Sequence, residues 1–276
     1  MARKGSNKSG NQEKVRHANR QKIQESKSSG KRNKQQVVDD RWDKKEATGR
    51  TVSTQKKENY VQKPVVAKNG KQREFLRALC THQVVVFIAP AGVGKSFLTM
   101  SEVTDWFKKG EVDKIMLSRP AVGMGNTIGL LKGGLVEKYT PFLLPLIDVV
   151  KERYGTGFYE NCLNNGSIEM LPLEYIRGRN ISQVAVVDEF QNCTPDEAYT
   201  MITRIAEGGK LILLGDPTQN DLRGKNALQW LPEFLEENPE LAEDIAIVEA
   251  ISDDIVRGGL CKKTVKAKEN SKVSMK

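Results

Sequence analysis

Apolar residues in the middle and C-terminal parts of the chain gather in short, uninterrupted runs. Six such runs, rich in valine, isoleucine and leucine, lie at residues 83–89, 113–118, 167–172, 182–188, 210–216 and 244–250. Because polar residues do not alternate with the apolar ones, these runs are typical of strands that are covered on both faces. We therefore predict a parallel sheet built from short strands.

Longer stretches with apolar residues three and four positions apart separate these runs. This helical spacing occurs at residues 70–79, 96–110, 140–155, 194–209 and 226–238. Strands that alternate with helices indicate the α/β class, with a mostly parallel sheet flanked by helices. In such folds, ligands bind at the carboxyl ends of the strands, so the chemistry should lie where the apolar runs end.

The two ends of the chain lack this pattern. Residues 1–68 are poor in apolar side chains and cannot offset their chain entropy by burial, so we predict a disordered basic tail there. Residues 1–70 contain 19 lysines and arginines against 7 acidic residues, whereas the remainder has a net charge of −3. We place one organised domain at residues 69–258 and a shorter basic tail at residues 259–276.

The basic N-terminal tail has two interpretations. It is either a solvated, solubilising segment or an arm that follows nucleic-acid phosphates and releases counterions at each contact. No aromatic platform or base-reading motif accompanies it, so the sequence leaves both open.

Cysteine and hydropathy patterns exclude several other classes. Four cysteines lie far apart, without a CxxC pair, and only two histidines accompany them. This spacing supports neither a zinc site nor a disulfide framework. There is no secretory signal and no apolar run of about 20 residues, the length that spans a bilayer. We expect a reduced, cytoplasmic protein without a membrane partner.

The stretch "APAGVGKSFLTM" follows the first apolar run and opens a helical stretch, which is the context of a phosphate-binding P-loop. Gly92 and Gly94 allow the backbone amides to surround phosphates, while Lys95 reaches the β- and γ-phosphates and Ser96 holds Mg²⁺. The usual first glycine is Ala89, which adds one methyl and is tolerated unless a positive φ is required. The groups that touch phosphate should come from Gly92 to Ser96. The predicted nucleotide-binding residues of this stretch are Ala89, Pro90, Ala91, Gly92, Val93, Gly94, Lys95, Ser96 and Phe97.

Two further runs end in polar residues. "VAVVDEFQN" ends in Asp188, which would support Mg²⁺, and Glu189, which would orient and deprotonate the attacking water. "LILLGDPTQ" ends in Asp216 and is followed by Gln219, which would sense the γ-phosphate or the water. Each motif also has a structural interpretation, as an acidic helix cap or as a Gly-Asp-Pro turn.

The order of motifs resembles the PhoH family of P-loop ATPases, which have a single RecA-like core of the helicase type. The resemblance covers about residues 69–260 and is carried by segments in this order: "PAGVGKS", "SRPAVGMGNTIGLLKGGLVEKYTPFLLPL", "IEMLPLEYIRGRNI", "VVDEFQN", "LLGDPTQNDLRGKNAL" and "DDIVRG". It implies ATP binding and Mg²⁺-dependent hydrolysis, and RNA binding or helicase activity as proposed for some members. The short core with a basic tail is more typical of a phage-encoded version. Phe190 stands where the family often has alanine.

The resemblance also implies roles for single residues. Gln72 matches the position of a glutamine that pairs with adenine. Three arginines, Arg119, Arg177 and Arg179, are candidates for nucleic-acid contact. The cation that stabilises the γ-phosphate would be Arg204, Arg223 or Arg257, and the choice among them stays open. The predicted catalytic set consists of Lys95, Glu189, Gln219 and Arg223.

One core of about 180 organised residues is a single domain, whereas a monomeric helicase closes two cores around ATP. Copies could therefore assemble into a homo-oligomeric ring, or the protein could hydrolyse ATP without unwinding. We expect an ATPase coupled to RNA or single-stranded nucleic acid. The alternatives are a nucleotide-gated adaptor with slow turnover and, more remotely, a small-molecule kinase.

Overall fold

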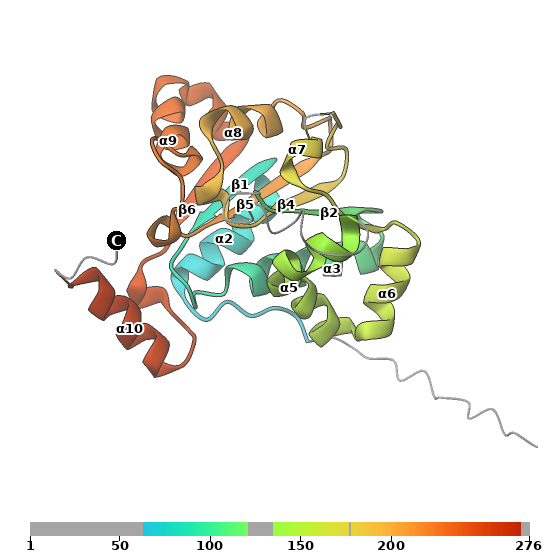
Figure 1. Ribbon diagram of the computed structural model, residues 1–276, viewed down its shortest axis with the longest axis horizontal. Helices are drawn as coiled ribbons and strands as arrows, with labels where there is room; N and C mark the ends of the chain where they lie inside the picture. The colour runs from blue at the N-terminus through green and yellow to red at the C-terminus, as the bar shows by residue number, and fades with distance from the viewer. Residues whose placement is uncertain (1–62, 121–134, 177, 272–276) are drawn as a thin grey trace, which may run out of the picture. The chain divides into compact units, whose positions relative to one another are not determined.

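The strands form one parallel sheet (Figure 1). The computed structural model describes residues 63–120, 135–176 and 178–271. All six predicted runs are strands in it: β1 (Val84–Ile88), β2 (Ile115–Ser118), β3 (Ile168–Met170), β4 (Val184–Val187), β5 (Lys210–Gly215) and β6 (Ile245–Glu249). The sheet order is β3-β2-β4-β5-β1-β6, and every neighbouring pair is parallel. The predicted fold class, a single P-loop NTPase core, is confirmed.

Helices cover both faces of the sheet. The described helices are α2 (Gly70–Thr81), α3 (Lys95–Lys109), α5 (Leu135–Tyr154), α6 (Thr156–Asn164), α7 (Leu173–Ile176), α8 (Pro195–Ile202), α9 (Ala227–Glu237) and α10 (Gly259–Glu269). Val85 and Phe87 of β1 pack with α2, α3, α5 and α6, whereas Val84 and Val86 pack with α7, α8 and α9. The strands β1, β2, β4, β5 and β6 bury alternate residues in different cores, which explains why their runs lack polar alternation. The edge strand β3 buries Ile168 and Met170 in one core, and Glu169 between them forms ion pairs.

Helix ends follow local capping chemistry. Thr194 and Asn226 each form a capping box at the start of α8 and α9, with a glutamate or glutamine three residues later. Gly110 ends α3 in the left-handed conformation. Helix α8 ends at Ile202, before the end of the predicted stretch at residue 209, because Ile205 pairs with Ile181 in an isolated parallel bridge.

The structure corrects both predicted domain boundaries. The expected C-terminal tail at residues 259–276 begins instead as helix α10, where Cys261 and Val265 pack against the core. Lys268 Nζ also donates to the Thr218 carbonyl at 3.1 Å. At the other end, Val65 packs against the same core, so residues 63–68 belong to the domain rather than to the tail. Residues 1–62 lie outside the described part of the chain.

A helix that crosses a bilayer needs about 20 mostly apolar residues. In the part of the chain that the structure describes, none of the helices combines the length and the apolar character that crossing a membrane requires.

Tight backbone packing at the start of β5 makes a first prediction. A Cβ added at Gly209 would lie 2.0 Å from the Ile181 carbonyl oxygen, whereas nothing lies within 4 Å of one added at Gly157 in α6. Gly209→Ala should therefore lower the free energy of unfolding by about 1–3 kcal/mol. The control Gly157→Ala should be neutral or raise it by up to about 1 kcal/mol, because alanine favours helix. Chemical denaturation measures both, and equal stability of the two variants would contradict this packing.

Candidate functional site

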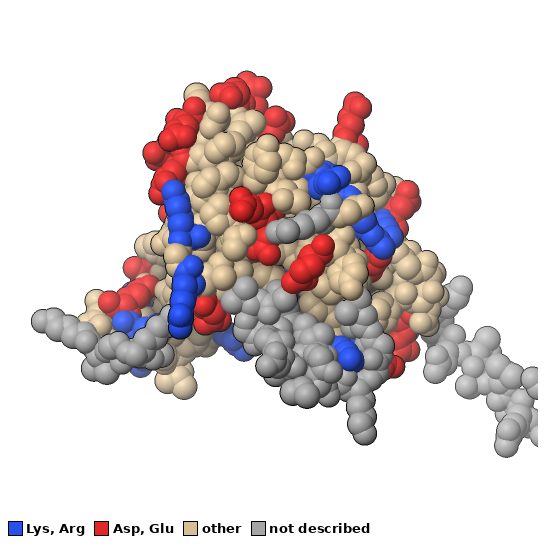
Figure 2. Space-filling model, turned by 45° about the horizontal axis from the view of Figure 1, so that its top comes forward, with Lys and Arg blue, Asp and Glu red and all other residues tan. Residues whose placement is uncertain are grey.

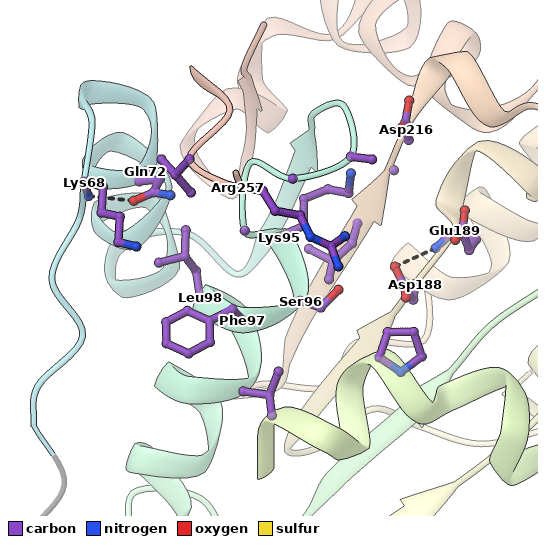
Figure 3. Close-up of a pocket in the computed structure, with 18 of the residues that line it drawn as sticks. Lys68, Gln72, Lys95, Ser96, Phe97, Leu98, Asp188, Glu189, Asp216 and Arg257 are labelled. Carbon is purple, nitrogen blue, oxygen red and sulfur yellow. Dashed lines mark hydrogen bonds between the residues drawn. The ribbon is translucent and has the colours of Figure 1, made fainter. Parts of the chain in front are cut away.

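The strand order brings three predicted motifs to one edge of the sheet. β5 lies between β1 and β4, so the loops that follow these strands are neighbours at their carboxyl ends. They open onto a pocket of about 730 Å³ (Figure 3). Its lining includes Ala91, Gly92, Gly94, Lys95, Ser96 and Phe97 of the P-loop region, Asp188, Glu189, Asp216 and Gln219 of the other two motifs, and Gln72 of α2. The structure therefore brings together most of the predicted site.

The P-loop has the geometry of an anion site. Gly92 and Gly94 have φ values of 90° and 99°, which favour glycine. Gly94 precedes α3 without a side-chain cap, so the first amides of the helix face the pocket and are available to a phosphate. Ala89 is fully buried and keeps a negative φ, so the backbone does not require glycine at this position. Among the predicted nucleotide-binding residues, Ala89, Pro90 and Val93 do not line the pocket.

The Lys95 side chain folds back onto its own loop. Its ammonium donates to the Ala89 carbonyl, and its distance to the Pro90 carbonyl oxygen is 3.3 Å. Burial lowers the pKa of Lys95, and the carboxylates of Asp216, Asp188 and Glu189 oppose that shift only in part. The Lys95 ammonium therefore lies at the pocket, where a bound phosphate would be in reach. The carboxylates named above partly balance its positive charge.

Asp188 is a buried carboxylate. Its side chain is 6% exposed, and Oδ1 accepts the Glu189 N–H at 3.0 Å. Burial and the neighbouring Glu189 raise the pKa of Asp188 to about 6. A divalent cation would compensate this charge, and the Ser96 hydroxyl lines the same pocket (Figure 3). These two oxygen donors are of the type that Mg²⁺ prefers, so they would suit such an ion.

Glu189 has the one positive φ among the described residues other than glycine, at 56°. This left-handed conformation at the end of β4 turns the chain directly after Asp188 and presents the carboxylate at the pocket. One carboxylate oxygen accepts from Gln191 Nε2, and the other lies 3.6 Å from Arg119 Nη2. Backbone strain of this kind is concentrated at functional sites.

Gln191 links the two acidic motifs and was missed by sequence reasoning. Its side chain is fully buried, its Oε1 accepts the Asp216 N–H at 2.9 Å, and its Nε2 also donates to the Gln219 carbonyl at 3.3 Å. Asp216 in turn accepts from Gln219 Nε2 at 2.8 Å. The signal was present, because "QN" directly follows the acidic pair "DEF" and amides are suited to bridging polar loops. Phe190, which directly follows the acidic pair, is fully buried in the core.

Gln72 lines the pocket but also supports the P-loop. Its side chain is 2% exposed, its Oε1 accepts the Lys68 N–H at 2.6 Å, and its Nε2 donates to the Val93 carbonyl at 2.7 Å. Each amide atom retains capacity for one more hydrogen bond. Pairing with adenine therefore stays a prediction, and a structural role of Gln72 is established beside it.

The structure separates the candidate arginines. Arg257 lines the pocket and reaches across the P-loop towards Ser96 and Lys95 (Figure 3), while its backbone N–H donates to the Gly92 carbonyl at 3.1 Å. Arg223, which was included in the predicted catalytic set, and Arg204 are exposed and do not line the pocket of their own chain. Their motif placed them near the site, but the loop after β5 directs Arg223 to solvent.

The candidate nucleic-acid contacts have different surroundings. Arg119 contacts Glu189, as described above, and Arg179 forms an ion pair with Glu169. Arg177 lies outside the described residues. Lysines and arginines gather in separate patches on the face shown in Figure 2, where acidic residues lie among them. The described surface on this face therefore contains no continuous basic stripe.

Part of the pocket wall comes from segments that carry no motif. These residues are Val66 and Lys68 before α2, Pro145, Val149 and Glu152 of α5, and Val256 before α10. They lie far from the P-loop in the sequence, and nothing in their residue types marks them as part of a binding site. Only the tertiary packing of these distant segments onto the core brings them to the pocket.

The buried charge of Asp188 predicts a pH-dependent stability. An unfolded aspartate loses its proton near pH 4, whereas Asp188 keeps it to about pH 6, so this group lowers the free energy of unfolding as the pH rises through that interval. The loss amounts to roughly 3 kcal/mol above pH 6. Without nucleotide and metal, Asp188→Asn should therefore be more stable than the wild type at pH 7 to 8, and the difference should vanish below pH 4.

Thermal unfolding across this pH range, with a chelator present, measures the effect. Asparagine keeps the acceptor for the Glu189 N–H, so the comparison isolates the charge. The exposed Asp113→Asn serves as the control for a surface carboxylate. A variant less stable than the wild type at pH 7 would show that Asp188 has a compensating partner.

Comparison with known proteins agrees with this arrangement. A family model described as "PhoH-like protein" matches residues 64–269. A PhoH-like protein of Synechocystis sp. is 37% identical over 210 residues, which cover 75% of this chain and 63% of the relative. A PhoH-like protein of Bacillus subtilis is 36% identical over 208 residues, which cover 74% and 64%.

The Escherichia coli K12 "Protein PhoH" is 32% identical over 207 residues, covering 74% of this chain and 58% of that protein. The chain thus spans less than two thirds of the length of each of these relatives. The match begins in the extended segment before α2 and ends with α10, which is the same unit that surrounds the pocket. The chain therefore belongs to the PhoH-like protein family.

Proposed function

We propose that this protein binds ATP together with Mg²⁺, hydrolyses it, and couples hydrolysis to the binding of RNA or single-stranded nucleic acid. The observation that carries the proposal is the pairing of opposite charges across one pocket. The uncapped N-terminus of α3 and the Lys95 ammonium lie on one side, and the Asp188 and Glu189 carboxylates lie on the other. Only a ligand that is both anionic and metal-bound satisfies both sides.

Binding would reorganise Lys95 more than the loop around it. The glycine conformations and the free amides of α3 are already in place, whereas the Lys95 ammonium is bound to the Ala89 carbonyl. A triphosphate offers that ammonium a charged acceptor, which is stronger than a neutral carbonyl. Ser96 and Asp188 would hold Mg²⁺, which supplies electrostatic stabilisation of the phosphates.

Hydrolysis would use Glu189 as the base. Its carboxylate accepts a proton from a water molecule while the water oxygen forms a bond to the γ-phosphorus. The bond from that phosphorus to the bridging β,γ-oxygen breaks, and its electron pair stays on ADP. Inorganic phosphate is the second product, and the proton on Glu189 returns to solvent. Arg257 approaches the same part of the pocket and would stabilise the charge that develops on the phosphate.

Two features support the nucleic-acid part of the proposal. Residues 1–70 concentrate the excess positive charge of the chain, which suits a phosphate backbone. Arg119 follows β2 at the same sheet edge as the nucleotide pocket, so a strand bound there would be close to the acidic pair. The described residues form one core, so translocation by this unit would require a second core to close against, which another copy of the chain would supply.

The central experiment compares steady-state ATP hydrolysis by the wild type and Glu189→Gln. Glutamine keeps the size of the side chain but cannot accept the proton, so kcat should fall about 10²- to 10⁴-fold. ATP binding should persist in Glu189→Gln and be lost in Lys95→Ala, as calorimetry with a non-hydrolysable analogue would measure. At low salt, single-stranded RNA should raise the wild-type rate. Equal rates for wild type and Glu189→Gln would refute hydrolysis at this site and leave a nucleotide-gated binding protein.

A second experiment locates the arginine that acts on the γ-phosphate. Because Arg257 lines the pocket of its own chain, Arg257→Gln should lower kcat about 10³-fold or more. Mixing this variant with Glu189→Gln chains should not restore activity, since every pocket then lacks one of the two groups. Lys225→Gln, which removes an exposed cation paired with Glu233, is the control. Recovery in the mixture would show instead that Arg257 acts on the pocket of a neighbouring copy. An unchanged rate in Arg257→Gln would exclude Arg257 and leave Arg223 as the first candidate.

A further inference from the structure

The Glu189 carboxylate is held from both sides. Gln191 Nε2 donates to Oε2, and Arg119 Nη2 lies 3.6 Å from Oε1. The Arg119 and Glu189 side chains are 26% and 23% exposed, so water still reaches the pair. Both carboxylate oxygens are thus directed at protein groups rather than at a water molecule in the pocket. The observed arrangement is therefore not the one in which Glu189 is placed to act as the base.

Arg119 is itself firmly placed. The buried Tyr139 hydroxyl accepts the Arg119 backbone N–H at 2.6 Å and donates to the carbonyl of the same residue at 2.7 Å. The guanidinium Nη1 donates to the Phe142 carbonyl at 3.0 Å. Helix α5 thus holds both the backbone and the side chain of Arg119 in place. A chance ion pair at the surface would not need such support.

The sheet register explains why these two side chains meet. β2 lies beside β4, Ser118 is opposite Val187, and the Asp188 N–H donates to the Ser118 carbonyl at 2.9 Å. The residue after β2 is therefore next to the acidic pair after β4. Glu189 lines the nucleotide pocket and Arg119 does not, so Arg119 reaches the carboxylate from outside the pocket.

We propose that Arg119 holds Glu189 in an unproductive position until a phosphate of a bound nucleic-acid strand takes the guanidinium. This inference rests on the proposed function and concerns the regulation of the same site. A phosphodiester offers Arg119 two oxygens for a bidentate contact, which suits a guanidinium better than one distant carboxylate oxygen. Because a partly exposed ion pair is weak, such an anion can replace Glu189. Binding of a nucleic-acid strand would then release Glu189, so that it can act as the general base in ATP hydrolysis.

The test measures ATP hydrolysis by full-length Arg119→Gln with and without single-stranded RNA at low salt. Without RNA, its rate should exceed that of the wild type, by about tenfold if Arg119 holds Glu189 in nine of ten molecules. Added RNA should then raise it little further. Lys225→Gln removes a cation from a different ion pair and should behave as the wild type in both conditions. A lower basal rate in Arg119→Gln would overturn the proposal, because Arg119 would then support Glu189; so would an unchanged basal rate.

Two further variants guard against a merely structural effect. Arg119→Lys keeps the charge but loses the planar fork, so its basal rate should lie between those of wild type and Arg119→Gln. Tyr139→Phe removes the anchor of the Arg119 backbone and should also raise the basal rate, provided that its thermal unfolding shows a folded protein. A basal rate in Arg119→Lys below that of the wild type would count against the mechanism.

Failure of the proposed function gives a different result. If no variant hydrolyses ATP faster than Glu189→Gln does, hydrolysis at this site is refuted as a whole. If hydrolysis depends on Glu189 but the basal rate does not respond to Arg119, only the regulatory contact is refuted. Stimulation that persists in Arg119→Gln to the wild-type extent would place the coupling contact elsewhere on the chain.

Discussion

The parallel register of four neighbouring strands is the constraint on which the site depends. β2, β4, β5 and β1 lie side by side and run in the same direction, so their carboxyl ends meet at one edge. The loops that follow them carry Arg119, the acidic pair, Asp216 and the P-loop. No single loop has the chemistry of the pocket. A strand shifted by one residue would also turn its side chains into the opposite core, and both cores are filled.

Polar cross-links then fix the loops to one another. The Gln191 amide contacts the loops after β4 and β5, and the Gly92 carbonyl accepts two backbone N–H groups from the segment before α10. A Cβ at Gly92 would lie 2.9 Å from Cys261 Sγ, so this approach leaves room only for glycine. The P-loop glycine therefore serves packing as well as phosphate binding, and a change there would disturb both.

The sequence predicted those parts of the molecule that are determined by residues close together in the chain. Uninterrupted apolar runs gave the strands, and the P-loop and the Asp188–Glu189 pair were placed at the correct strand ends. What escaped prediction depends on contacts between distant segments. Nothing local in "GLCKKTVKAKE" shows that this basic stretch covers Gly92 as a helix. Arg223 and Arg257 are both exposed, and only the tertiary arrangement, which places Arg257 at the pocket, distinguishes them. The role of Gln72 in supporting Val93 likewise arises from packing across 21 residues.

The pocket keeps opposite charges apart, and this separation has a functional consequence. Asp188 is buried, Lys95 is bound to neutral carbonyls, and Glu189 has a partner outside the pocket. Each group therefore has a weaker partner than the one that ATP, Mg²⁺ or nucleic acid would offer. Ligands that replace these partners bind one arrangement of the site better than the other, and such a difference is what allows binding to shift a conformational equilibrium.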